Sequence, residues 1–98
     1  MNQRDILKII NTKLFKVISS CSDQNNVKCY LIGGFVRDLI NGNKEPKDID
    51  ILIIGDGIYI AKKVCNILGL NDPTIYKRFG TAAFKFNEYD IEFVGSRK

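Results

Sequence analysis

Apolar residues recur along the chain with two periods, which predicts a mixture of helices and strands. The first amphipathic segment spans residues 3–20, where lysines occupy polar positions and the apolar positions are Ile6, Ile10, Leu14, Val17 and Ile18. This spacing places the apolar side chains on one face of a helix. We expect that helix to pack on a sheet rather than to bind a membrane or a partner helix.

The rest of the pattern predicts strands alternating with two further helices. The expected strands are, in chain order, Lys28–Ile32, Asp48–Ile54, Ile75–Arg78, Ala82–Phe86 and Tyr89–Val94. A short helix over Phe35–Ile40 is expected to end at Asn41-Gly42, and a longer helix over Ile58–Leu68 is expected to end at Gly69. The Asn87-Glu88 pair predicts a hairpin between the last two strands.

Composition narrows the class of protein. Ninety-eight residues with 45% hydrophobic content are typical of one folded domain with a modest core. No apolar run approaches the ~20 residues of a transmembrane helix, and the N-terminus does not resemble a secretory signal. We therefore expect a cytoplasmic protein without a membrane partner. The net charge of +4 is compatible with nucleic acid but does not require it.

The cysteines argue against a disulfide or zinc framework. Cys21, Cys29 and Cys65 leave one thiol unpaired in any disulfide scheme, and they show no Cys-x-x-Cys spacing. The chain has no histidine that could complete a zinc site. We expect free thiols in a reducing compartment.

Gly33-Gly34 lies at the junction between the first predicted strand and the short helix that follows. Glycine at such a junction permits a positive φ and lets an anion approach the backbone N–H groups. A helix N-terminus adds unpaired donors and partial positive charge, so phosphate is favoured there. The alternative interpretation is a tight turn without a ligand.

Asp48 and Asp50 begin the most apolar predicted strand. In a strand their carboxylates project from one face, about 6.6–7 Å apart along the chain, while the intervening isoleucines point into the core. Two carboxylates at this spacing can converge on one divalent ion or on a pair of ions, and Mg²⁺ is usually held by one or two carboxylates with water and phosphate oxygens. A solvated surface strand is the alternative, but like charges at this position repel and need a counter-ion.

Two further acids compete for a functional role. Asp56, in Gly55-Asp56-Gly57, is expected to cap the helix that follows. Asp90 lies two residues before Glu92 on the same predicted strand face, where the role of a solvated hairpin residue is favoured.

The order of these motifs resembles the head-domain signature of class II CCA-adding tRNA nucleotidyltransferases and bacterial poly(A) polymerases. Leu31–Gly42 and Pro46–Asp50 carry the first part of the resemblance. Phe79–Ala82 resembles the family's Gly-Thr strand, and Ile91–Arg97 resembles its acidic strand that ends in arginine. The match runs from about Tyr30 to Lys98, and the ordered set is specific although each piece alone is not.

The resemblance implies a role for each matched residue. Asp48 and Asp50 match metal-binding catalytic carboxylates, and Glu92 matches a third acid on the later strand. The nucleotide-binding residues that it implies are Gly33, Gly34, Arg37, Asp38 and Arg97. The usual pattern ends in Thr-Thr-Phe-Arg, whereas this chain reads Val-Gly-Ser-Arg over residues 94–97, a form found in a branch of the family.

The implied reaction transfers a nucleoside monophosphate from CTP or ATP to the 3′-hydroxyl of an RNA, with tRNA as the expected acceptor, and releases pyrophosphate. The implied cofactor is Mg²⁺ or Mn²⁺. Phosphoryl transfer needs positioning and charge neutralisation, so the absence of histidine is compatible with it. Two alternatives stay open: a small nucleotidyltransferase acting on a protein or small molecule, and a non-catalytic nucleotide-binding module. The three acids favour an enzyme.

The implied fold is α/β (α+β), the polymerase-β-like nucleotidyltransferase fold with a mixed sheet and helices packed on one side. The predicted order of elements agrees with it. Residues 1–98 are expected to form a single head domain, without the neck, body and tail domains that follow in the family. We therefore expect a catalytic fragment, or a head that relies on a helical partner domain or subunit. The sequence does not distinguish CCA addition from poly(A) addition.

Overall fold

The computed structural model describes residues 12–34, 37, 41–42 and 47–96. Its elements within these ranges are, in chain order, α2 (Lys13–Gln24), β1 (Lys28–Ile32), β2 (Asp48–Ile54), α4 (Gly57–Leu68), β3 (Thr74–Tyr76), the 3-10 helix η1 (Lys77–Phe79), β4 (Thr81–Phe86) and β5 (Tyr89–Ser96). The two long helices and the five strands follow one another in the order that the sequence pattern predicts.

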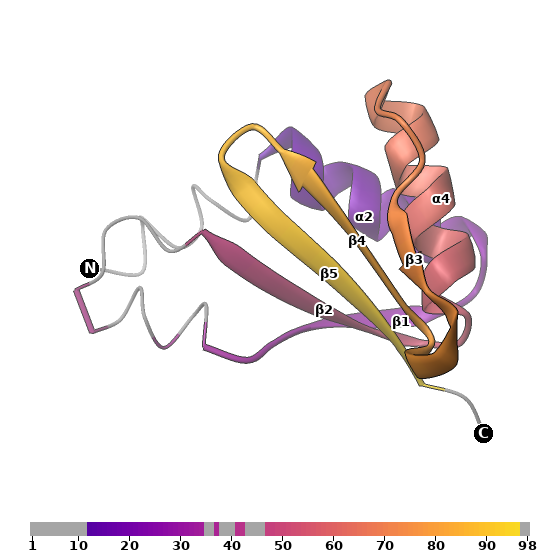
Figure 1. Cartoon of the computed structure of the whole chain (residues 1–98), viewed down its shortest axis with the longest axis horizontal. Coiled ribbons are helices and arrows are strands. Elements are labelled where there is room, and N and C mark those ends of the chain that lie inside the picture. The colour runs from indigo at the N-terminus through magenta and orange to yellow at the C-terminus, as the bar shows by residue number, and fades with distance from the viewer. Residues whose placement is uncertain (1–11, 35–36, 38–40, 43–46, 97–98) are drawn as a thin grey trace.

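The five strands form one mixed sheet in the order β1-β2-β5-β4-β3. β2 and β5 are parallel neighbours near the middle of the sheet, and the other pairs are antiparallel. Figure 1 shows these two strands side by side, although α4, β3, η1 and β4 separate them in sequence. The mixed sheet expected from the sequence is therefore confirmed. β1 and β3 are its edges.

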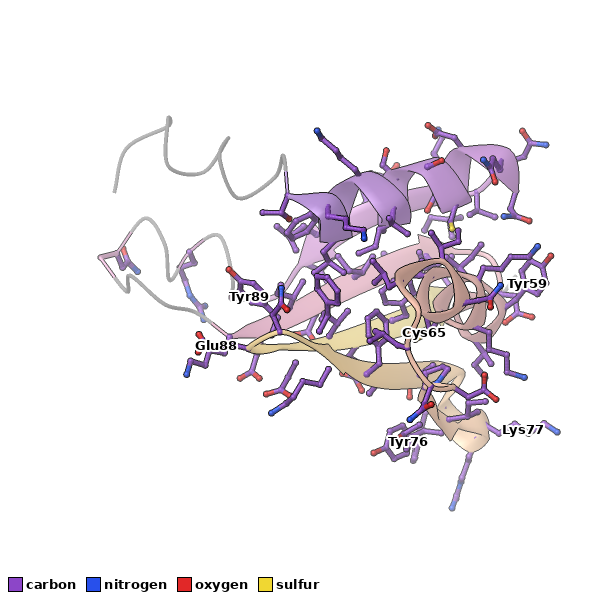
Figure 2. The ribbon with its side chains drawn as sticks, turned by 90° about the horizontal axis from the view of Figure 1, so that it is seen from above. Tyr59, Cys65, Tyr76, Lys77, Glu88 and Tyr89 are labelled. Carbon is purple, nitrogen blue, oxygen red and sulfur yellow. The ribbon has the colours of Figure 1, made fainter. Side chains whose placement is uncertain are left out.

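Among the described elements, α2 and α4 cover one face of the sheet, and no helix covers the other, which we call the open face (Figure 2). The two-residue period of a strand explains why one face is apolar and the other polar, because alternate side chains of β2 point to opposite faces. Ile49, Ile51 and Ile53 are buried under the helices, where they contact Phe93 of β5 and apolar residues of both helices. The expectation that these isoleucines point into the core is confirmed. No helix among the described residues is long and apolar enough to cross a membrane.

Three predicted boundaries differ from the structure by two residues or more. The first helix continues past Ser20 to Gln24, because Cys21 and Ser22 are buried and the Ser22 hydroxyl donates to the Ile18 carbonyl at 2.9 Å. The strand predicted over 75–78 covers only Thr74–Tyr76, and η1 replaces its second half. The last strand extends past Val94 to Ser96.

Two predicted segments fall largely outside the described residues. These are the first part of the N-terminal helix, residues 3–11, and most of the short helix over Phe35–Ile40. Arg37 is described there and is helical, and its carbonyl accepts a hydrogen bond from the N–H of Asn41 at 2.9 Å.

Gly57 and Gly95 let the start of α4 lie directly against β5. A Cβ added at Gly57 would lie 2.7 Å from the Gly95 nitrogen, closer than real Cβ contacts. Helix propensity alone predicts that Gly57→Ala stabilises the protein by about 1 kcal/mol. We expect the contact to reverse that sign and to give a net loss of about 1–3 kcal/mol. A fall in the urea midpoint at unchanged m-value would show this, and a rise would contradict it.

The cysteines differ in burial. Cys21 and Cys65 are buried and Cys29 is half-buried, all three as free thiols. Burial raises the pKa of the Cys65 thiol to about 11, with a smaller contribution from the negative charge of Asp72. Burial also raises the pKa of Cys21, although Lys63 opposes the shift.

Because only the thiolate reacts, these pKa values predict unequal labelling. At pH 8 a disulfide reagent should modify Cys29 first, while Cys21 and Cys65 react only after the chain is unfolded by denaturant. The thiolate fraction of Cys65 should rise only as the pH approaches its raised pKa. Equal rates for all three thiols in the native protein, measured by mass spectrometry of the modified chain, would contradict this order.

Candidate active site

Four carboxylates line the open face of the sheet where β2 and β5 run in parallel. The register pairs Asp48 with Asp90 and Asp50 with Glu92. Since paired residues of adjacent strands project to the same face, all four side chains lie opposite the helix-covered side. The structure therefore brings Asp50 and Glu92, 42 positions apart in sequence, onto adjacent strands.

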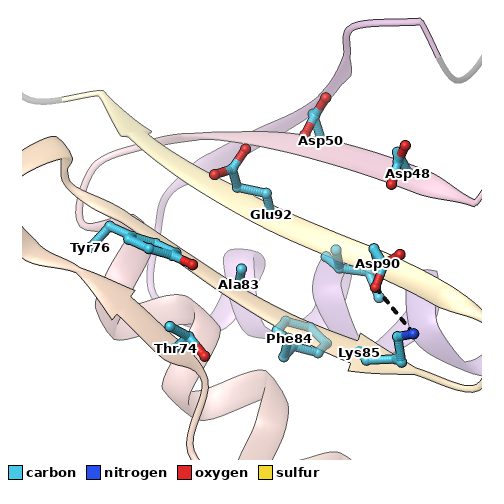
Figure 3. A pocket seen from close by; sticks show the side chains of 10 residues that line it. Asp48, Asp50, Thr74, Tyr76, Ala83, Phe84, Lys85, Asp90 and Glu92 are labelled. Carbon is cyan, nitrogen blue, oxygen red and sulfur yellow. Dashed lines mark ion pairs between the residues drawn. The ribbon is translucent and has the colours of Figure 1, made fainter.

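These acids border a hollow of about 500 Å³ that extends from β2 across β5 and β4 to β3. Its other walls come mainly from Thr74, Tyr76, Ala83 and Lys85. Figure 3 shows Asp48 and Asp50 along one side, Glu92 and Asp90 on the next strand, and Tyr76 on the opposite side. A volume of this order is in the range of small-ligand sites.

Gly33, which directly follows β1, borders one of these acids, Asp50. Ile32, the last residue of β1, pairs with Asp50, so the chain turns directly beside that carboxylate. Gly33 has a φ of +74°, and a Cβ at this residue would lie 2.9 Å from Asp50 Oδ2. The positive φ predicted for this turn is confirmed. Glycine is thus required for two reasons, the backbone conformation and the space beside a carboxylate.

The two competing acids have structural partners. Asp56 caps α4, because its Oδ1 accepts a hydrogen bond from the N–H of Tyr59 at 3.1 Å, as the sequence predicts. Asp90 lies 3.6 Å from Lys85 Nζ across the β4–β5 hairpin, and both side chains are mostly exposed. Such a pair contributes little to stability. It nevertheless distinguishes Asp90 from Asp50, which faces the Gly33 turn.

The donor set fits a hard divalent cation. Asp48 is exposed and Asp50 is half-buried, so both carboxylates are accessible from the hollow. Within the described residues, no three acidic, histidine or cysteine side chains form a ready-made metal cluster. Mg²⁺ does not need one, because it usually binds one or two carboxylates and completes its octahedron with water and phosphate oxygens. Asp48 and Asp50 satisfy this requirement, with Glu92 as the adjacent acid.

Two of the residues implied by resemblance, Asp38 and Arg97, lie outside the described residues. Arg37 is described and exposed. Gly34 follows Gly33 in the same turn. Nothing observed here assigns a ligand to these four positions, so their nucleotide-binding roles remain predictions.

The sequence pattern did not single out the β3 and β4 wall of the hollow. Thr74 pairs with Ala83, which in turn pairs with Glu92, so a row of residues leads across the sheet from β3 to the acids. Lys85 and Tyr76 also face the hollow. The alternation of side chains along β4 places Ala83 and Lys85 on one face. The sequence does not show that β4 pairs with β5, which brings this face beside Glu92.

The comparisons with known proteins agree on one family for this chain. Residues 29–98 match the family described as the poly A polymerase head domain. An A-adding tRNA nucleotidyltransferase of Geobacter sulfurreducens is 32% identical over 93 residues, which cover 88% of this chain and 10% of that protein. The chain thus spans about a tenth of the length of this curated relative.

Two solved structures share the fold. A tRNA nucleotidyltransferase complexed with a primer tRNA and an incoming ATP analogue has a TM-score of 0.74 and 31% identity, over 82% of this chain and 23% of that chain. A Thermotoga maritima CCA-adding enzyme complexed with tRNA has a TM-score of 0.76 and 32% identity, over 92% of this chain and 21% of that one. These similarities confirm the nucleotidyltransferase fold expected from the sequence.

Proposed function

The chain belongs to the poly(A) polymerase head-domain family, and on this basis we propose that it is the catalytic head of a tRNA nucleotidyltransferase. The head transfers a nucleoside monophosphate from ATP or CTP to the 3′-hydroxyl of tRNA and releases pyrophosphate. Residues 1–98 form one head domain in this proposal. The relatives' printed names and the complexes with tRNA and an ATP analogue support it.

The observation that carries the proposal is the position of Gly33 against Asp50. The backbone turn at Gly33 lies beside the carboxylate of Asp50, which shares one face of β2 with Asp48. A divalent cation held by Asp48 and Asp50 would supply the positive charge that neutralises the triphosphate. Glu92 lies beside Asp50 and contributes a third negative charge at the same place. The hollow next to them has a volume of about 500 Å³, in the range of small-ligand sites.

The chemistry required of the protein is mainly positioning. Phosphoryl transfer gains its rate from alignment of the attacking and leaving oxygens and from charge stabilisation. Both tasks suit side chains fixed on a sheet, since β2 and β5 hold their carboxylates in a defined register. Asp90 has no assigned step, because its carboxylate pairs with Lys85.

Nucleotide incorporation tests the proposal. The full chain is incubated with tRNA lacking its 3′-terminal nucleotides, labelled ATP or CTP and Mg²⁺, alone and with the part of the Geobacter sulfurreducens relative that this chain does not match. We expect labelled tRNA that is longer at its 3′ end, and no product in EDTA.

Two outcomes would contradict the proposal and identify what replaces it. Binding of magnesium-ATP without incorporation in either arm would indicate a nucleotide-binding module. Label transferred to a protein or a small molecule, but never to tRNA, would indicate a different acceptor.

A further inference from the structure

The sheet edge at β3 and the adjoining η1 expose two aromatic and two basic side chains in succession. Tyr76 is 48% exposed and Phe79 is 70% exposed. Lys77 and Arg78 lie between them and are exposed as well. The Arg78 guanidinium lies 5.9 Å from the centroid of the Phe79 ring. We refer to residues Tyr76–Phe79 as the edge strip.

Packing does not explain these aromatic residues. The core aromatics contact one another, as in the tilted pair of Phe84 and Phe93 with ring centroids 5.6 Å apart. Phe79 and Tyr76 are absent from the core cluster and from the apolar residues packed on it. Large exposed rings next to a polar hollow are typical of a binding surface rather than of a core.

Tyr76 connects the edge strip to the candidate active site. It lies on the wall of the hollow opposite Asp48 and Asp50. Three strand spacings separate β3 from β2, or about 14 Å at the usual spacing of adjacent strands. Figure 3 shows the tyrosine ring directed toward Ala83, whose small side chain leaves the space between Tyr76 and Glu92 open.

The acids on β2 and β5 and the basic residues of the edge strip carry opposite charges. The four acids on β2 and β5 disfavour RNA phosphates at that wall unless a cation is bound. Lys77 and Arg78 form no ion pair with the residues that the structure describes, so their charges are available to a ligand. Neighbouring aromatic and basic side chains are a combination that binds single-stranded nucleic acid, through base stacking and phosphate contacts.

We propose that the edge strip holds the single-stranded 3′ end of the RNA acceptor, with a base stacked on Tyr76 and the preceding phosphates bound by Lys77 and Arg78. The strip directs the terminal hydroxyl across Ala83 toward Glu92 and Asp50. This inference rests on the proposed function, because it assigns the acceptor side of the same site. It makes Tyr76 a residue that binds the acceptor directly.

RNA binding without turnover tests the inference separately from catalysis. The probe is a fluorescein-labelled single-stranded RNA with a free 3′-hydroxyl, titrated with the full chain in Mg²⁺ without nucleotide, and followed by anisotropy. Tyr76→Ala should weaken binding about tenfold or more, because it removes one stacked base. Tyr76→Phe should bind nearly as well as the wild type, since the ring is kept.

Tyr59 provides the matched control. It is 46% exposed and carries Lys63 5.4 Å from its ring centroid, but it lies on α4, which covers the opposite face of the sheet. Tyr59→Ala should leave RNA affinity unchanged. Lys77→Gln and Arg78→Gln should each reduce the slope of log affinity against log salt by about 0.7, the value for one lost phosphate contact to a single strand.

Failure of this inference can be distinguished from failure of the proposed function. Asp50→Asn should retain RNA binding while transfer is lost, and Tyr76→Ala should raise the KM for tRNA without changing the KM for ATP. Absence of RNA binding by the wild type, or equal weakening by Tyr59→Ala and Tyr76→Ala, would overturn the inference. Unchanged RNA affinity in Tyr76→Ala would also overturn it and would indicate that the edge strip contacts another part of the protein.

Discussion

Replacing Asp50 or Asp48 by asparagine is expected to lower nucleotide transfer about a thousandfold while the fold is kept. The substitution preserves shape but removes a charge from the pair proposed to hold the cation. Loss of several kcal/mol of transition-state stabilisation corresponds to this factor. Stability should change by less than about 0.5 kcal/mol, because neither side chain is fully buried. Single-turnover rates with labelled ATP, together with thermal melts, measure both quantities.

Asp90→Asn is the matched control for these variants. Asp90 lies on the same face of the sheet and pairs with Asp48 in register, but its carboxylate contacts Lys85. We expect transfer within about twofold of the wild type, since an exposed pair of this kind is worth at most about 1 kcal/mol. If Asp90→Asn and Asp50→Asn lost equal activity, a general change in surface charge would explain the loss, and the assignment of Asp50 would be wrong.

Gly33→Ala is expected to lower transfer about a hundredfold. The new Cβ would lie 2.9 Å from Asp50 Oδ2, so the carboxylate would have to move away from the turn. Displacement of a reacting group by about 1 Å can cost this factor in rate. The variant should also lose roughly 1–2 kcal/mol of stability, because an L-residue is strained at a φ of +74°.

Gly69→Ala is the control that separates the loss of stability from the loss of nucleotide transfer. Gly69 ends α4 with a φ of +75°, nearly the same as Gly33, but a Cβ there would meet nothing within 4 Å. Both alanine variants should therefore lose similar stability, and only Gly33→Ala should lose transfer at saturating substrate. Equal activity of the two folded variants would show that the Gly33 turn does not control the Asp50 carboxylate.

The sequence predicted the parts of the site that depend on local geometry. The two-residue period of a strand places Asp48 and Asp50 on one face and the isoleucines between them in the core, as the structure shows. The glycine at the end of β1 predicted a turn with positive φ, which Gly33 has. Asp56 was predicted to cap α4, and its hydrogen bond to Tyr59 confirms it.

The hydrophobic pattern of the sequence does not predict which strands are neighbours in the sheet. Periodicity gives the face of each strand but not its neighbour, so only the family resemblance placed Glu92 beside Asp50. The pairing of Lys85 with Asp90 depends on the register of the hairpin in the same way. The predicted strand at residues 75–78 failed in its second half, because Lys77–Phe79 form a 3-10 turn that ends at Gly80 with a φ of +66°.

The most direct test of the account is a crystal structure with Mn²⁺ and a non-hydrolysable ATP analogue. Anomalous scattering locates the metal independently of the protein density. The account predicts a metal bonded to carboxylate oxygens of both Asp48 and Asp50 at about 2.1 Å, with the triphosphate on the side of Gly33. A metal bound elsewhere, with these two carboxylates apart and no phosphate beside Gly33, would contradict it.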